Sequence, residues 1–267
     1  MYKLMKPKKV NSIEGFNTGE YVFEVKLDGG SGLLVKKDDK LEIYHGSGER
    51  RTYRYPDVRS DGNLIKDGVY ACELCVFNDD NVTDFSLFQR RQVEKNFLIE
   101  VRSKRFPIVA MVYDVLFDGK EDVRDYDLLE RKKILEKNVV DGNHIRLVEF
   151  YENVNPILTM KDKIEGVVIK HKYSKYLCGK RDKWYKYRFN REETVKIIDF
   201  EEWSGDNGLD GVILITEDGR RVNLAGRDSY RAKEMLKENG EITVEICYHS
   251  KTEKGFRFPV VKRILGD

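Results

Sequence analysis

The chain has 267 residues, of which 36% are charged and 40% are apolar. This length and composition are typical of a soluble, highly charged globular protein with one large domain or two modest ones. The net charge of +2 excludes an unusually basic chain as a whole, and no apolar stretch is long enough for a signal peptide or a membrane span.

Strand patterns dominate the first 190 residues. The expected strands are residues 21–26, 32–36, 41–44, 68–77, 108–117, 145–150 and 166–170. Two helices are expected among them. Thr83 or Asp84 can cap a helix that runs through Phe97. Asp125 or Asp127 can cap a second, whose apolar residues recur at a spacing of about 3.6.

The pattern changes after residue 190. Five short strands are expected at residues 194–200, 211–216, 221–224, 242–247 and 256–264, with a helix over 228–239 that Gly240 stops. Five strands with a helix before the fourth fit a small Greek-key barrel of the OB type, which often binds nucleic acid. We therefore divide the chain into domains of residues 1–189 and 190–267.

The four cysteines do not form a disulfide framework in a chain of this length. Cys72 and Cys75 make a CxxC pair, but Cys178 and Cys247 do not supply the second pair that a zinc site needs. We expect four reduced thiols, with Cys72 and Cys75 in the core, in the cytoplasm of a bacterium or of a phage- or virus-infected cell.

The stretch Lys26-Leu27-Asp28-Gly29 follows the strand-like run 21–25 and begins at the last residue of the first expected strand. A lysine there can be a nucleophile that carries a nucleotide as a phosphoramide, provided that neighbouring cations and desolvation favour its neutral form. Strand alternation places Glu24 and Lys26 on one face, about 7 Å apart. The alternative interpretation is that Lys26 is a surface lysine on an edge strand without a catalytic role.

Candidate partners for such a lysine follow downstream in order. Glu73 is a lone carboxylate in an apolar strand, and Tyr113 lies in another strand, where an aromatic residue is usually core. Lys186 and Arg188 share one strand face, as a clamp on a phosphate requires. In the segment from Glu165 to Lys170, alternation separates the two end residues, so if both line a pocket the strand must bend or end between them.

Residues 170–191 form a basic stripe with nine lysines and arginines against one aspartate, interleaved with five tyrosines and tryptophans. Such a stripe suits a polyanion, and its alternative interpretation is a solvated face.

These segments together resemble the ordered motifs of ATP-dependent DNA ligases, in the lysine nucleotidyltransferase superfamily that also holds RNA ligases and mRNA capping enzymes. The resemblance runs from about Lys26 to the C-terminus and includes a helix-start pattern at residues 85–91. It implies an α+β fold, with a nucleotidyltransferase domain of ATP-grasp-like antiparallel sheets and helices followed by a C-terminal OB-fold β-barrel.

The resemblance also implies a role for each matching residue. Lys26 would take AMP, Glu24 would lie near the adenine amino group, and Tyr113 would stack on the adenine ring. Glu73 and Glu165 would serve the ribose and a divalent metal, Mg²⁺ or Mn²⁺. Three cations would contact phosphates: Lys170, Lys186 and Arg188. Five more would contact DNA or pyrophosphate: Lys180, Arg181, Arg257, Lys262 and Arg263.

The chain departs from the family pattern at Ser31 and Gly46, where arginines usually hold substrate groups near the phosphates. The last motif also ends at Asp267 without the usual Asp-Lys tail. Nearby arginines that could substitute are Arg50, Arg51 and Arg54.

The function that the resemblance implies is the sealing of nicks in duplex DNA by a monomer without a separate N-terminal DNA-binding domain. ATP would adenylate Lys26, the AMP would pass to the 5′-phosphate at the nick, and the 3′-hydroxyl would then displace it. The nearest alternative is an RNA ligase, for which Ser31 gives some support. A capping guanylyltransferase and a non-catalytic nucleic-acid clamp are further alternatives.

Overall fold

The computed structural model describes residues 3–204, 210–252 and 255–265. The chain forms two compact units, Met1–Arg188 and Phe189–Asp267, and each has its own hydrophobic core. No helix in the described part of the chain is long and apolar enough to cross a membrane.

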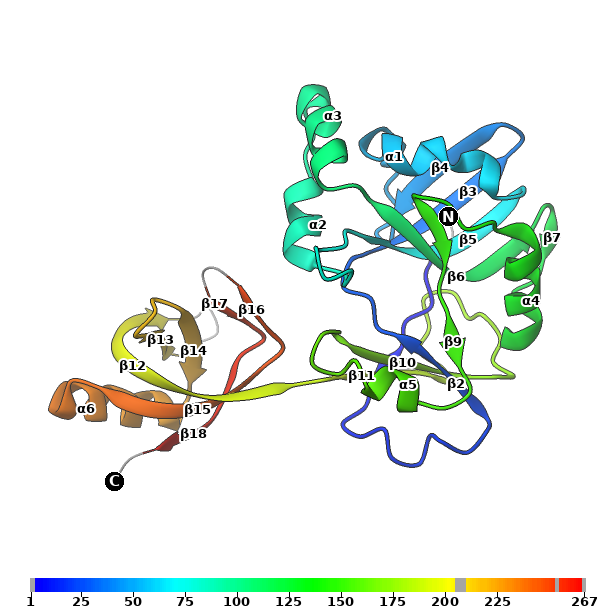
Figure 1. Cartoon of the computed structure of the whole chain (residues 1–267). Coiled ribbons are helices and arrows are strands. Elements are labelled where there is room, and N and C mark those ends of the chain that lie inside the picture. Colours follow the sequence, from blue (N-terminus) through cyan, green and yellow to red (C-terminus); the bar gives the residue numbers. More distant parts are fainter. Residues whose placement is uncertain (1–2, 205–209, 253–254, 266–267) are drawn as a thin grey trace. The chain divides into compact units, whose positions relative to one another are not determined.

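The first unit contains two sheets, which Figure 1 shows as separate layers. The larger has the order β4-β3-β5-β6-β7, with β8 parallel to β6 and the other pairs antiparallel. Its strands are β3 (Gly30–Lys37), β4 (Lys40–His45), β5 (Gly68–Cys75), β6 (Val109–Asp118), β7 (Glu121–Asp122) and β8 (Ile145–Leu147). Strand β5 is buried along most of its length because it is central, and it carries the thiols of Cys72 and Cys75 into the core.

The smaller sheet has the order β1-β11-β10-β2-β9, and only the β1–β11 pair is parallel. Its strands are β1 (Lys8–Lys9), β2 (Tyr21–Val25), β9 (Phe150–Tyr151), β10 (Gly166–His171) and β11 (Trp184–Arg188). Val22 and Trp184 of this sheet pack in one apolar cluster with Leu33, Ala71 and Leu116 of the larger sheet. This shared core holds the two sheets together.

Short helices cover the first unit. They are α1 (Pro56–Ser60), α2 (Phe85–Arg91), α3 (Asn96–Arg105), α4 (Leu128–Asn138) and α5 (Asn155–Leu158), with single 3₁₀ turns at η1 (Thr52–Arg54) and η2 (Gly62–Leu64). Asp84 caps α2 by accepting from the N–H of Ser86 at 2.7 Å and of Leu87 at 3.1 Å. Helix α4 begins after Asp127, whose N–H donates to Glu130.

Two expected elements of this unit are each divided. The helix expected to run through Phe97 is two helices, α2 and α3, because Lys95 is extended and Phe97 is 72% exposed, so the buried face of α2 does not continue. The strand expected over 145–150 is β8 and β9, which belong to different sheets. The chain crosses between the layers at this point.

The second unit is one sheet in the order β16-β17-β14-β13-β12-β15-β18, packed on α6. Its elements are β12 (Arg191–Ser204), β13 (Asp210–Thr216), β14 (Arg221–Ala225), α6 (Arg227–Asn239), β15 (Ile242–Tyr248), β16 (Ser250–Thr252), β17 (Gly255–Arg257) and β18 (Val260–Leu265). Gly240 ends α6 in the left-handed conformation, with φ of 76°. The strand expected over 256–264 is divided, because Phe258 has a positive φ and Pro259 follows it. Within the described residues, no strand pairing closes this sheet into a barrel.

Candidate active site

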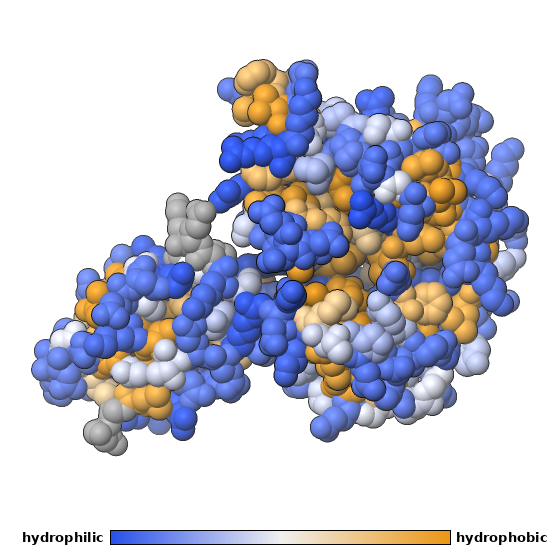
Figure 2. Space-filling view, in the orientation of Figure 1, coloured by the Kyte–Doolittle hydropathy of each residue, from blue (hydrophilic) through white to orange (hydrophobic). Residues whose placement is uncertain are grey.

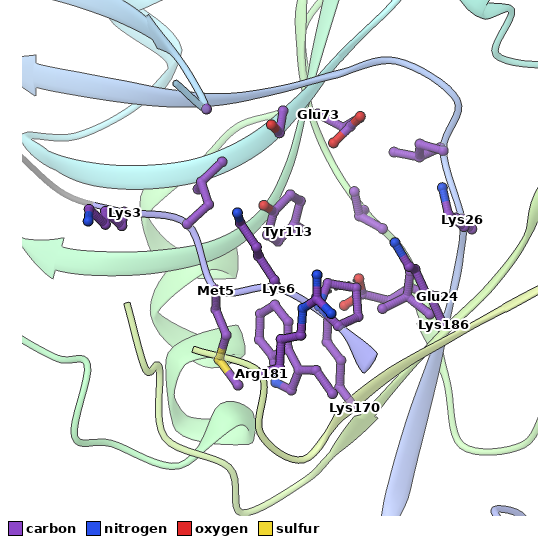
Figure 3. Close-up of a pocket in the computed structure, with 18 of the residues that line it drawn as sticks. Lys3, Met5, Lys6, Glu24, Lys26, Glu73, Tyr113, Lys170, Arg181 and Lys186 are labelled. Atoms are coloured by element: carbon purple, nitrogen blue, oxygen red, sulfur yellow. Dashed lines mark ion pairs between the residues drawn. The ribbon is translucent and has the colours of Figure 1, made fainter. Parts of the chain in front are cut away.

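A cavity of about 600 Å³ lies in the first unit and is lined by residues of both sheets. Figure 2 shows apolar residues inside the hollow between these sheets and mainly hydrophilic residues around it. Figure 3 shows Lys26, Glu73, Tyr113 and Lys186 around this space, each on a different strand or strand end. The fold therefore brings together residues that are up to 160 positions apart.

Lys26 lies directly after β2 and is held at both its backbone and its side chain. Its N–H donates to the carbonyl of Gly166 at 2.9 Å, and its Nζ forms an ion pair with Glu165. The other oxygen of Glu165 accepts from Nε of Arg188 at 2.9 Å. One buried carboxylate thus binds both the proposed nucleophile and a proposed phosphate ligand.

Strand β10 begins at Gly166, so Glu165 precedes the strand while Lys170 lies within it. The N-terminal end of the strand therefore lies between the two residues, which simple alternation would place on opposite faces. A Cβ atom at position 166 would lie 2.1 Å from the carbonyl oxygen of Tyr187. Only glycine allows this close approach of β10 and β11, which brings Glu165 to Arg188.

The loop after Lys26 is fixed against β5 and α2. The N–H of Asp28 donates to Oγ1 of Thr83 at 2.9 Å. A Cβ at Gly29 would lie 2.3 Å from the carbonyl oxygen of Leu74, and one at Gly30 would lie 2.3 Å from the ring of Phe88. Contacts within the protein thus require glycine at positions 29 and 30.

Glu73 and Lys186 flank Lys26, and both have shifted pKa values. Burial raises the pKa of Glu73 to about 8; Lys26 opposes this rise, and the negative charge of Glu165 adds to it. Burial also lowers the pKa of Lys186, and the positive charges of Lys26 and Arg188 lower it further. Such shifts are typical of catalytic sites.

Glu24 lies between two buried lysines in the cavity wall. Its two carboxylate oxygens are each 2.6 Å from an ammonium group, one of Lys132 and the other of Lys170. Lys170 also lies over the rings of Trp184, at 4.2 Å, and Tyr113, at 4.7 Å. Burial lowers the pKa of Lys170 to about 8; Glu24 opposes this and Lys132 adds to it. Lys170 is thus engaged inside the wall, and a phosphate contact by it stays a prediction.

Sequence reasoning missed Lys132. It lies four residues after Leu128 and three before Leu135, on the buried face of α4. A lysine within an apolar stripe was the available signal, because such a residue needs a buried partner.

The N-terminal segment was not assigned either. Lys3 and Lys6 line the cavity together with Arg181, whereas Lys180 is exposed and is not among the lining residues. Ser31 and Gly46 lie in the same wall. The three arginines that could substitute for the usual pair each form an ion pair with a glutamate: Arg50 with Glu42, Arg51 with Glu49 and Arg54 with Glu94.

The remaining predicted contacts belong to the second unit. Lys262 pairs with Glu192, and Nε of Arg263 lies 2.6 Å from Glu245. The guanidinium of Arg257 lies 5.6 Å from the centre of the Phe258 ring. Their roles toward DNA or pyrophosphate stay predictions.

The comparison with protein families decides where the chain belongs. Residues 4–188 match the family model described as ATP dependent DNA ligase domain. The chain belongs to this family. The match covers all the strands that line the cavity, so the cavity lies within the ATP-dependent DNA ligase domain.

Curated relatives of this ligase domain have similar sequences over most of the chain. A DNA ligase of Thermococcus fumicolans is 27% identical over 225 residues, which cover 78% of this chain and 37% of the relative. An SPbeta prophage-derived DNA ligase-like protein, LigB, of Bacillus subtilis is 27% identical over 189 residues, covering 67% and 66%. The chain spans about a third of the length of the first relatives it matches.

Solved structures show the same fold for the ligase domain. A structure from a study of Lig E DNA ligases, described as binding DNA with a minimal scaffold, has a TM-score of 0.68 at 16% identity and covers 99% of this chain and 100% of its own. The ligase domain of M. tuberculosis LigD has a TM-score of 0.60 at 18% identity, covering 98% and 95%. The fold is thus that of a nucleotidyltransferase ligase domain with mixed sheets and few helices.

Proposed function

We propose that the protein seals 5′-phosphate/3′-hydroxyl nicks in duplex DNA and that it carries AMP on Lys26. The observation that carries this proposal is the ion pair of Lys26, which lines the cavity of a ligase-family chain, with Glu165, the carboxylate that also pairs with Arg188. A related mycobacterial DNA ligase D, 19% identical with a TM-score of 0.62, was solved as a complex with ATP.

Adenylation begins with a nucleotide in the cavity. The ring of Tyr113 and the apolar side chains of Val148 and Val168 offer a surface for a base. Glu165 contacts the ammonium of Lys26, and this ammonium must lose a proton to solvent before it attacks. Deprotonated Lys26 attacks the α-phosphorus of ATP, an N–P bond forms, and pyrophosphate leaves.

Lys186 and Arg188 offset the negative charge that spreads over the phosphoryl oxygens, which is where phosphoryl transfer gains most of its catalysis. No cluster of three or more metal-ligating side chains occurs in the described residues. Magnesium bound through substrate phosphates needs only one or two carboxylates, so Glu73 and Glu165 fit this ion, or Mn²⁺, which would neutralise phosphate charge.

The AMP then passes to the 5′-phosphate of a nick, and the 3′-hydroxyl attacks that phosphate and releases AMP. We assign this chemistry to an adenylation domain, residues 1–189, and an OB-type fold to residues 190–267. In its described residues the second unit has many strands and the helix α6, which supports the OB assignment. We expect a cytoplasmic monomer whose partner is nicked duplex DNA.

The test is covalent labelling. With α-phosphate-labelled ATP and Mg²⁺, we expect one AMP per chain by intact mass, and loss of the label in Lys26→Arg, because a guanidinium does not become a neutral nucleophile. Lys40→Arg, an exposed lysine at the start of β4, is the matched control. Label that persists in Lys26→Arg would contradict the assignment. Sealing of nicked DNA measured beside nicked RNA decides between the two polynucleotides.

A further inference from the structure

We propose that Lys3 and Lys6 of the N-terminal segment, together with Arg181, bind the terminal phosphate of the nucleic-acid strand that receives AMP. This inference rests on the proposed function, since it names how the same cavity recognises its second substrate. Figure 3 shows Lys6 extending into the cavity and Lys3 at its edge.

The N-terminal segment is held rigidly by its backbone. The N–H of Met5 donates to the hydroxyl of Tyr176 at 3.0 Å, and the N–H of Lys6 donates to the carbonyl of Lys180 at 3.0 Å. The side chains of Leu4 and Met5 are buried. Lys3 and Lys6 therefore project from a fixed backbone, which lowers the entropic cost of binding an anion.

The cations of the cavity fall into two groups. Lys26 and Lys170 are paired with Glu165 and Glu24. In the part of the chain that the structure describes, four cations that line the cavity have no carboxylate within ion-pair range: Lys3, Lys6, Arg181 and Lys186. Positive charges that the protein leaves uncompensated in a concave site attract an anion.

These cations lie at a wall of small residues. A Cβ at Gly46 would lie 2.2 Å from Oγ of Ser31 and 3.3 Å from Cδ1 of Leu4. The wall thus contacts the N-terminal segment between Lys3 and Lys6. Ser31 and Gly46 contribute no charge there, so the positive charge beside this wall comes from the N-terminal segment.

The strand phosphate is the anion that this arrangement fits. Lys186 and Arg188 belong to the group around Lys26, where the AMP phosphate is bonded. The receiving phosphate must reach the same cavity, because it attacks that phosphorus. A phosphate monoester carries a charge of about −1.5 to −2 at neutral pH, and it calls for cations beyond those that hold AMP.

The test compares Lys3→Gln/Lys6→Gln with the control Lys8→Gln/Lys9→Gln, which changes two exposed lysines of β1 that do not line the cavity. Binding to a nicked duplex is measured in EDTA, which prevents sealing, with either a 5′-phosphate or a 5′-hydroxyl at the nick. We expect the preference for the 5′-phosphate to fall at least tenfold in the first variant and to stay within twofold in the control. Lysyl-AMP formation and its dependence on ATP concentration are measured in both variants and should stay within twofold in the control.

Three results would overturn the proposal. The first is an unchanged preference of Lys3→Gln/Lys6→Gln for the 5′-phosphate nick. The second is an equal loss of affinity for both nicks, which indicates contacts to internal phosphates. The third is a raised ATP requirement for adenylation, which indicates that the two lysines bind the pyrophosphate end of ATP. If the proposed function is wrong, the wild-type protein forms no lysyl-AMP. The binding comparison between the two nicks still decides the role of Lys3 and Lys6 in that case.

Discussion

Glu73 shows how position alone changes the chemistry of a residue. It lies on the central strand β5 of the larger sheet, and burial raises its pKa to about 8. At neutral pH the carboxyl group therefore retains its proton in the folded protein. Binding of a divalent cation beside it would release that proton, because metal ligands must be deprotonated.

The raised pKa makes stability depend on pH with a known sign. Between its usual pKa of 4.5 and about 8, Glu73 holds a proton in the folded chain that the unfolded chain has lost. Stability therefore falls as pH rises through this window, by at most about 1.4 kcal/mol per pH unit. Glutamine does not titrate, so the free energy of unfolding of Glu73→Gln should rise relative to wild type from pH 5.5 to 8.5.

Urea unfolding at pH 5.5, 7.0 and 8.5 measures this difference. Glu136→Gln, an exposed carboxylate on α4, is the control and should show no such trend. A difference between Glu73→Gln and wild type that is the same at all three pH values would mean that Glu73 is ionised throughout.

At the scale of elements, buried charges attach α4 to both sheets. Arg131 forms two contacts with Asp114 of β6, at 2.7 and 3.0 Å, and Lys132 reaches Glu24 of β2. The group formed by Glu24, Lys132 and Lys170 has two positive charges and one negative. Its balance depends on Glu24, since this carboxylate is the shared partner of both lysines.

This imbalance predicts unequal costs for two substitutions. Glu24→Gln leaves two buried ammonium groups without their carboxylate, and we expect a loss of about 3–5 kcal/mol in the free energy of unfolding. Lys132→Met leaves a neutral pair of Glu24 and Lys170 and should cost about 1 kcal/mol or less. Urea unfolding at pH 7 compares them, and equal losses would show that the carboxylate is not the shared partner.

At the scale of the whole molecule, no hydrophobic cluster among the described residues combines residues from before and after the boundary at 188/189. The two clusters of the first unit contain residues up to Trp184, and that of the second begins at Val195. A unit with its own core can fold alone. The division into residues 1–189 and 190–267 made from the sequence differs from this boundary by one residue.

We therefore predict that fragments 1–188 and 189–267 each fold. Calorimetry of the intact chain should give two transitions, and each fragment should reproduce one of them within a few degrees. A single transition that is lost when the chain is divided would mean that the units depend on each other for stability.

The sequence by itself determined the features that depend on near neighbours. Alternation predicted that Glu24 and Lys26 share a face, and both line the cavity. Asp84 and Asp127 were each one of two candidate caps for their helices, and Gly240 was expected to stop α6. Each of these rests on contacts within a few residues, which local backbone geometry fixes. The ordered motifs likewise identified the ligase family.

Only the tertiary structure decided which distant residues meet. Glu24 and Lys132 are 108 positions apart, and the N-terminal Lys6 enters a cavity whose Arg181 lies far along the chain. The division of 145–150 between two sheets likewise depends on partners outside the segment. Local pattern does not encode such contacts, because they form only when packing of the two sheets closes the long loops between them.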